Sequence, residues 1–160
     1  MDEYQYRTTY ESINPYRCVF EKAINSRVCS CSRSHRFNLA DREGVACNSL
    51  PRMERCNHLL TELRKKARFA LRRREVSQTL AHADEIKIQN GGMLGLQLQV
   101  DQSHTQTVKD IDSLIHRAES QFDGINGFPY SQLMQGIIAY RARSHRHRSR
   151  TRKKSKDPVD

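Results

Sequence analysis

The sequence contains no tryptophan, and aromatic residues make up only 7% of its 160 residues. Apolar residues of all kinds reach 36%. A chain of this length is sufficient for one domain of ordinary size and a tail, but so few apolar residues predict a modest core. Domains with a small core often depend on an additional stabilising element, such as a metal ion or an oligomer interface.

Long apolar runs are also missing. No segment approaches the roughly 20 apolar residues that a membrane-spanning helix needs, and residues 1–4 are polar rather than apolar as in a secretion signal. We therefore expect a soluble protein with no membrane partner, located in the cytoplasm or, in a eukaryote, in the nucleus. In such a reducing compartment, cysteines remain thiols or bind metal rather than forming disulfides.

The motifs of several large enzyme classes are absent. The sequence has no nucleophile elbow, phosphate-binding loop, Rossmann glycine pattern or paired-histidine zinc motif. The glycines of residues 90–95 lack the spacing and the lysine of a phosphate loop, so they predict a turn and a close packing contact. A cysteine nucleophile with His35 or His58 as its base is an alternative, but we do not expect an enzyme.

All five cysteines lie within 39 residues, in the pattern C-x10-C-x-C-x15-C-x8-C. Core cysteines would be spread among the other apolar residues, whereas these occur where apolar residues are fewest. Thiolates bind zinc and iron–sulfur clusters strongly, and a metal in this region would replace the missing core. We therefore predict a metal site formed by cysteines. The candidate ligands are Cys18, Cys29, Cys31, Cys47 and Cys56.

The spacing leaves the identity of the metal open. Zinc sites usually contain a C-x2–4-C pair, which this chain lacks, although His35 and His58 are alternative zinc ligands. Widely spaced cysteines are accommodated more readily around a cubane cluster, so we expect an iron–sulfur cluster first and zinc as the alternative. The order of the cysteines is similar to that of small iron–sulfur regulatory proteins. Because their C-x-x-C is missing, no residue role is transferred from them.

Four ligands are needed and five cysteines are present. Cys29 and Cys31 are the pair that we consider first. Cys56 lies on the apolar stripe of a predicted helix, so it is either a buried core residue or the fourth ligand. If Cys56 belongs to the core, the ligands are the remaining four, Cys18, Cys29, Cys31 and Cys47.

Hydrophobic periodicity predicts a mostly α-helical fold. The strongest feature is a basic amphipathic helix over residues 51–80, which begins at Pro51 after the cap residue Ser49. Its apolar residues recur at helical spacing and form one continuous stripe. That stripe consists of Met53, Cys56, Leu60, Leu63, Ala67 and Ala70.

Two further helices are expected over residues 107–123 and 129–141. Between them and the first helix, residues 86–89 alternate like a short strand and residues 90–92 resemble a turn. The expected organisation has three parts. A Cys-rich metal-binding region, 1–50, packs on a small helical bundle, 51–140, and a disordered basic tail, 141–160, follows.

The net charge of +10 is concentrated in two segments. Residues 64–74 hold seven Lys and Arg residues and residues 141–156 hold nine, in both cases without an acid. Such clusters bind polyanions by releasing condensed counterions, without reading a base sequence. The nucleic-acid-binding residues that we predict are Arg64, Lys65, Arg68, Arg72, Arg73, Arg141, Arg143, Arg146, Arg148, Arg150, Arg152, Lys153 and Lys154.

Together these patterns favour a metal-binding protein that binds RNA or DNA non-specifically through the basic helix and tail. If the metal is an iron–sulfur cluster, loss of the cluster would act as a redox switch. Two alternatives stay open. The first is a redox or assembly accessory protein that docks on an acidic partner protein, and the second is a metal-free helical adaptor. The tail also has the composition of a nuclear localisation signal, and a helix face rich in Arg and Lys is often simply solvated.

Overall fold

The computed structural model describes residues 1–72 and 80–142. The mostly helical fold predicted from the sequence is confirmed, with one small two-stranded sheet in the described part of the chain. No described helix is long and apolar enough to cross a membrane. In chain order the elements are α1 (Glu3–Ile13), α2 (Glu21–Asn25), β1 (Ser34–Leu39), β2 (Arg42–Cys47), α3 (Leu50–Ala70), α4 (His82–Asp101), α5 (Ile111–Phe122), the 3-10 helix η1 (Ile125–Gly127) and α6 (Tyr130–Ala139).

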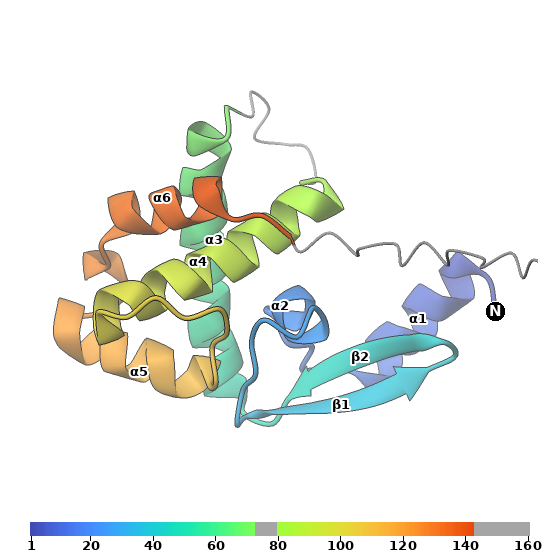
Figure 1. Cartoon of the computed structure of the whole chain (residues 1–160). Coiled ribbons are helices and arrows are strands. Elements are labelled where there is room, and N and C mark those ends of the chain that lie inside the picture. The colour runs from blue at the N-terminus through green and yellow to red at the C-terminus, as the bar shows by residue number, and fades with distance from the viewer. Residues whose placement is uncertain (73–79, 143–160) are drawn as a thin grey trace, which may run out of the picture.

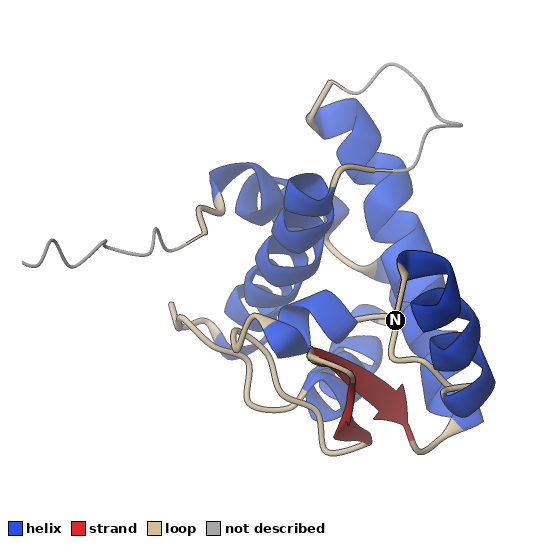
Figure 2. Ribbon diagram, turned by 90° about the vertical axis from the view of Figure 1, so that its right-hand side faces the viewer, coloured by secondary structure: helices blue, strands red, loops and turns tan. Residues whose placement is uncertain are grey.

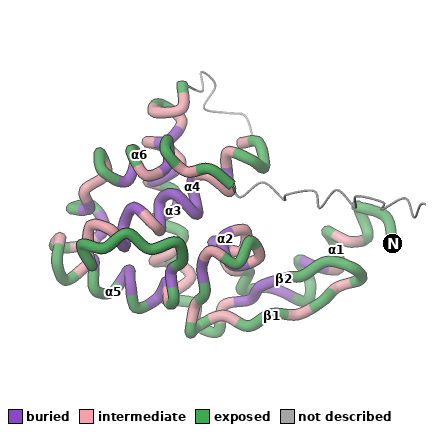
Figure 3. The backbone as a smooth tube through the Cα atoms, viewed as in Figure 1, coloured by how far each residue is buried: buried purple, intermediate pink, exposed green. Residues whose placement is uncertain are grey.

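The helices α3, α4, α5 and α6 form the main body of the molecule (Figure 1). Helix α4 lies between α5 and α6 and contacts both, and α3 runs across the group. The hairpin of β1 and β2 lies at the edge of this helical body (Figure 2), with α2 and β2 packed against each other. Buried residues concentrate on the inner faces of the helices and on β2 (Figure 3).

Helix α3 carries the predicted apolar stripe. Leu60, Leu63 and Ala67 are fully buried, whereas Met53 and Cys56 at the start of the helix are half-buried. The predicted end of this helix, near residue 80, is wrong. The structure ends it at Ala70 because Arg72 adopts a left-handed backbone conformation with a φ of 57°. Such a residue stops a helix even when it is not glycine. The rest of the predicted helix, residues 73–79, lies outside the described residues.

The strand and turn predicted over residues 86–92 are wrong, since α4 is one continuous helix through this stretch. The close packing contact predicted for these glycines is confirmed, since they pack against α6. A Cβ atom on Gly91 would lie 2.7 Å from the Cα atom of Ile137 and 2.8 Å from the carbonyl oxygen of Gly136. Tertiary packing therefore overrides the local preference of the glycines for a turn.

The helices expected over 107–123 and 129–141 correspond to α5 and α6, which are shorter. Helix α5 begins only after Asp110, whose side chain accepts a hydrogen bond from the amide of Asp112 (3.1 Å). Val108, which sequence periodicity places on this helix, pairs instead in an extended bridge with Cys29. The tail predicted over 141–160 lies outside the described residues from residue 143 onward.

The hairpin between residues 34 and 47 has no counterpart among the sequence predictions. Its strands pair in antiparallel register from Ser34 opposite Cys47 to Leu39 opposite Arg42. The turn contains Ala40 with a φ of 53°, a conformation in which glycine or asparagine is usual. Because β1 is largely polar and its turn lacks glycine, neither the alternation nor the turn could be recognised.

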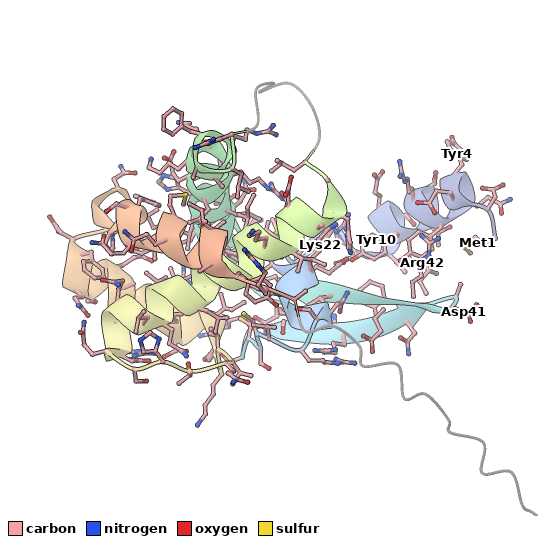
Figure 4. The ribbon with its side chains drawn as sticks, turned by 45° about the horizontal axis from the view of Figure 1, so that its top comes forward. Met1, Tyr4, Tyr10, Lys22, Asp41 and Arg42 are labelled. Atoms are coloured by element: carbon pink, nitrogen blue, oxygen red, sulfur yellow. The ribbon has the colours of Figure 1, made fainter. Side chains whose placement is uncertain are left out.

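Helix α1 is held to the body mainly through Tyr10, its buried residue. The Tyr10 hydroxyl donates to the Glu21 carboxylate, and Asn14 Nδ2 donates to the same hydroxyl (3.0 Å). Burial, followed by the Glu21 carboxylate, raises the pKa of Tyr10 to about 12, so this phenol stays protonated at neutral pH. Figure 4 shows Tyr10 near Lys22 of α2, while Tyr4 lies on the outer side of α1.

Replacing Tyr10 with phenylalanine is expected to lower the free energy of unfolding by about 1–2 kcal/mol, because two partners lose the hydroxyl. The loss stays modest since Glu21 still accepts from the Val45 amide (3.2 Å). Urea denaturation measures it. Tyr4→Phe is the matched control, because Tyr4 is 79% exposed. Equal effects of the two substitutions would show that the hydroxyl of Tyr10 is not what attaches α1.

Candidate metal centre

Four of the five cysteines line one small cavity. Cys18 precedes α2, Cys31 precedes β1, Cys47 ends β2 and Cys56 lies in the second turn of α3. The cavity has a volume of about 20 Å³, which is room for one water-sized occupant. Below, these four residues are called the cavity cysteines. The hairpin and the entry to α3 thus bring together thiols that are up to 38 positions apart in the sequence.

Burial makes ionisation of Cys18, Cys31 and Cys56 unfavourable in the absence of a metal. Burial chiefly, with smaller contributions from the neighbouring thiols, raises the pKa of Cys18 to about 12 and that of Cys56 to about 11. The pKa of Cys31 is also raised, again chiefly by burial. These three thiols are therefore poor nucleophiles at neutral pH.

Several groups nevertheless direct hydrogen-bond donors at these sulfurs. The amide of Phe20 lowers the pKa of Cys18, and the amides of Arg33 and Asp112 lower that of Cys31, in each case against the larger effect of burial. The Arg55 guanidinium acts on Cys56 in the same direction. Donors of this kind stabilise thiolates, and around metal-bound sulfurs they adjust the properties of the metal.

Cys29 lies apart from the cavity. Its side chain is 1% exposed and belongs to the hydrophobic core, and its amide donates to the Ala23 carbonyl (3.1 Å). Burial raises the pKa of its thiol to about 12. Cys29 does not line the cavity, although its thiol is close enough to that of Cys31 for the two to interact electrostatically. The structure therefore places Cys29 in the core and Cys31 at the cavity, and it places Cys56 beside Cys18, Cys31 and Cys47.

The two histidines considered as zinc ligands are also elsewhere. His35 is exposed on β1, and His58 is exposed on α3 where it lines a separate hollow with Glu119. Across residues 1–72 and 80–142, no three His, Cys, Asp or Glu side chains are arranged as ligands around one point. The cavity cysteines share a cavity, but their sulfurs are not in the geometry of a metal-bound site.

A surface groove of about 490 Å³ reaches the cavity from one side. Cys18, Val19 and Met53 line both the groove and the cavity. Cys18 is therefore the cavity cysteine next to this groove.

Three arginines surround a single carboxylate on the wall of the cavity. Asp112 accepts from Arg55 Nη2 (2.7 Å) and Arg52 Nη1 (3.0 Å), and Arg33 Nε lies 3.5 Å away. The Asp112 side chain is 11% exposed. Burial opposes its ionisation, but the hydrogen bond and charge of Arg55, followed by Arg52, hold the pKa of Asp112 below its ordinary value. Arg55 Nε also lies 3.6 Å from a second carboxylate, that of Glu119, so three cations face two carboxylates next to the four thiols.

Replacing Asp112 with asparagine is expected to cost about 2–3 kcal/mol of unfolding free energy at pH 7, because three cations lose their shared partner. Because the pKa of Asp112 is lower in the folded protein than in the unfolded chain, its carboxylate stabilises the fold at any pH above the unfolded-state pKa of about 3.9. This stabilisation is lost as the pH falls from that value through the folded-state pKa. The difference between wild type and variant should therefore shrink below about pH 4. Urea denaturation across pH measures it, with the exposed Asp41→Asn as control. A difference that is constant with pH would contradict this account.

The predicted nucleic-acid-binding residues of α3 are partly engaged. Arg64 Nη2 donates to Glu85 on α4 (3.1 Å), and Lys65 lies 3.5 Å from Glu62. Arg72 is exposed beyond the end of the helix. Arg141 donates to the carbonyl of Ile138 (2.9 Å) just after α6. Arg68 also lies on α3. The other predicted residues, which are Arg73 and the basic residues of segment 143–154, lie outside the described residues.

Sequence reasoning missed the arginines and the carboxylate around the cavity. Arg52, Arg55 and Asp112 were not singled out because Asp112 is about 60 positions away from both arginines, and no local pattern links them. The cysteine cluster was the signal that located this region. Comparison with protein-family models, curated proteins and solved structures found no match, so the site is interpreted from its own residues.

Proposed function

We propose that this chain binds a metal through the four cavity cysteines. The observation that supports the proposal is that thiols from four separate segments line one cavity, while the fifth, Cys29, is in the core. Each segment alone is short and has few buried residues. A metal bound by all four would tie the chain before α2, the hairpin and α3 into one unit, and its binding energy would add to folding.

The charges around the cavity support the same proposal. Arg33, Arg52 and Arg55 face two carboxylates, Asp112 and Glu119, so additional negative charge nearby would be stabilised by these arginines. Four thiolates around a divalent ion, or around a cubane cluster, carry net negative charge. The cavity cysteines would hold the metal as thiolates, and Arg55 and the donating amides would stabilise those thiolates.

An iron–sulfur cluster is our first candidate for the occupant, and zinc is the second. Ligands from four separate segments, without a C-x-x-C knuckle, suit a cubane, whose irons each take one cysteine. The small cavity favours a single zinc ion, which needs four sulfurs at about 2.3 Å. A cubane would require the side chains of the cavity cysteines to move apart.

The proposed function also includes non-specific binding of nucleic acid through the basic end of α3 and the tail. The excess of Lys and Arg in residues 64–74 and 141–156 supports it. A redox or assembly accessory protein that docks on an acidic partner uses the same charge and is the second candidate. A metal-free adaptor is the third. We propose no enzymatic activity.

The experiment is anaerobic purification, followed by an absorption spectrum and elemental analysis for iron, zinc and acid-labile sulfide. Iron and sulfide in equal amounts, with broad visible absorption, would establish a cluster. A colourless protein with one zinc per chain would establish a structural zinc site. Protein that retains neither metal, before and after anaerobic reconstitution with each, would overturn the proposal and leave the adaptor.

A further inference from the structure

Phe69 is the most exposed large apolar side chain in the described part of the molecule. It lies in the last turn of α3 and is 90% exposed. Its position is not explained by the fold, because it contributes nothing to the core and phenylalanine is only a moderate helix former. Other aromatic side chains of this region have partners. Tyr130, for example, lies under the ammonium group of Lys66 at 4.5 Å.

The surroundings of Phe69 are strongly basic. Lys65 precedes it by one helical turn and therefore lies on the same side of α3. Arg72 is exposed and follows just beyond the end of the helix. Glu62 is the acid that contacts Lys65 (3.5 Å), and it also accepts from Lys66 (3.0 Å). The side chain of Lys65 is largely exposed, so its ion pair with Glu62 is weak.

We propose that Phe69, Lys65 and Arg72 form a binding platform for single-stranded nucleic acid. An exposed aromatic ring stacks on any unpaired base, and flanking cations contact the phosphates on either side of it. A base pair in a duplex does not offer its face to such a ring, so the platform selects single strands. This inference rests on the nucleic-acid part of the proposed function and is independent of the metal centre.

An acidic protein is the other partner that this charge would attract. It would gain from the cations, whereas every unpaired base offers a flat face that can stack on an exposed phenylalanine ring. We therefore argue for nucleic acid.

The test measures the affinity of the full-length protein for fluorescent oligothymidine and oligouridine by anisotropy. Phe69→Ala is expected to weaken binding by roughly 5- to 100-fold, the range for loss of one stacked base. Phe69→Trp should bind at least as tightly as wild type. Tyr4→Ala is the matched control, because it removes another highly exposed aromatic ring and should change affinity by less than about twofold.

Two further measurements complete the test. Lys65→Ala and Arg72→Ala should each lower the slope of log affinity against log salt concentration by about one, as expected for the loss of one phosphate contact. Duplex of the same sequence should bind more weakly and should not respond to Phe69→Ala. If wild type binds single strands and Phe69→Ala binds equally well, the platform is wrong although nucleic-acid binding stands. If wild type binds neither single strand nor duplex, the platform and the nucleic-acid part of the proposed function are both wrong. The proposed metal centre does not depend on this result.

Discussion

Replacing Cys29 with alanine is expected to leave metal binding intact, whereas alanine at any one of the four cavity cysteines is expected to abolish it. Cys29 lies in the core, away from the cavity that the other four line. A structural metal site with three remaining thiols has an open position and binds far more weakly. Metal per chain should therefore fall from one site in wild type and Cys29→Ala to near zero in the other four variants.

The same series separates packing from ligation. Cys29→Ala removes a buried sulfur and should cost about 1–2 kcal/mol of unfolding free energy without loss of metal. The cavity variants should lose the whole metal contribution to folding, and their stability should no longer respond to a chelator. Elemental analysis and thermal unfolding with and without chelator measure both effects. Loss of metal in Cys29→Ala, with retention in Cys56→Ala, would restore the ligand set Cys18, Cys29, Cys31 and Cys47.

Replacing Gly91 with alanine is expected to lower the unfolding free energy by about 3 kcal/mol or more. The added Cβ would lie 2.7 Å from the Cα of Ile137 and 2.8 Å from the carbonyl oxygen of Gly136. Both are backbone atoms of α6, so α4 and α6 must separate to admit it. The gain in helix propensity, about 1 kcal/mol, is too small to offset this.

Gly95→Ala is the matched control, because it lies one turn further along the same helix and faces the same neighbour. A Cβ there would lie 3.5 Å from the Cα of Leu133, which is an ordinary contact. The same substitution is therefore expected to be neutral or slightly stabilising at this position. Urea denaturation of both variants measures the contrast. Equal losses at Gly91 and Gly95 would show that α4 and α6 are not as close as described.

Sequence periodicity predicted the helices best where one face of a helix is apolar and the other polar. Helix α3 has such a stripe, and Leu60, Leu63 and Ala67 are buried as expected. Helix α4 was mistaken for a strand and a turn because it is covered on several sides and has no single apolar face. Its buried residues include polar ones such as Gln89 and Asn90, which make hydrogen bonds to Ala23 and Ser26.

The region of the candidate site could be predicted from the sequence, but its composition could not. Clustering of the cysteines identified residues 18–56. Which thiols meet depends on the hairpin, which has no counterpart among the sequence predictions, and on the packing of Cys29 into the core. The contribution of Asp112 depends on packing of α5 against α3, and no local pattern in the sequence contains that information.

X-ray absorption at the edge of the retained metal is the measurement that tests the central claim most directly. Four sulfur ligands at about 2.3 Å, without nitrogen or oxygen, are predicted for zinc, and iron with sulfur ligands and neighbouring iron atoms for a cluster. The signal should be the same in wild type and in Cys29→Ala. Coordination by nitrogen or oxygen, or a first shell that changes in Cys29→Ala, would contradict a centre built from Cys18, Cys31, Cys47 and Cys56.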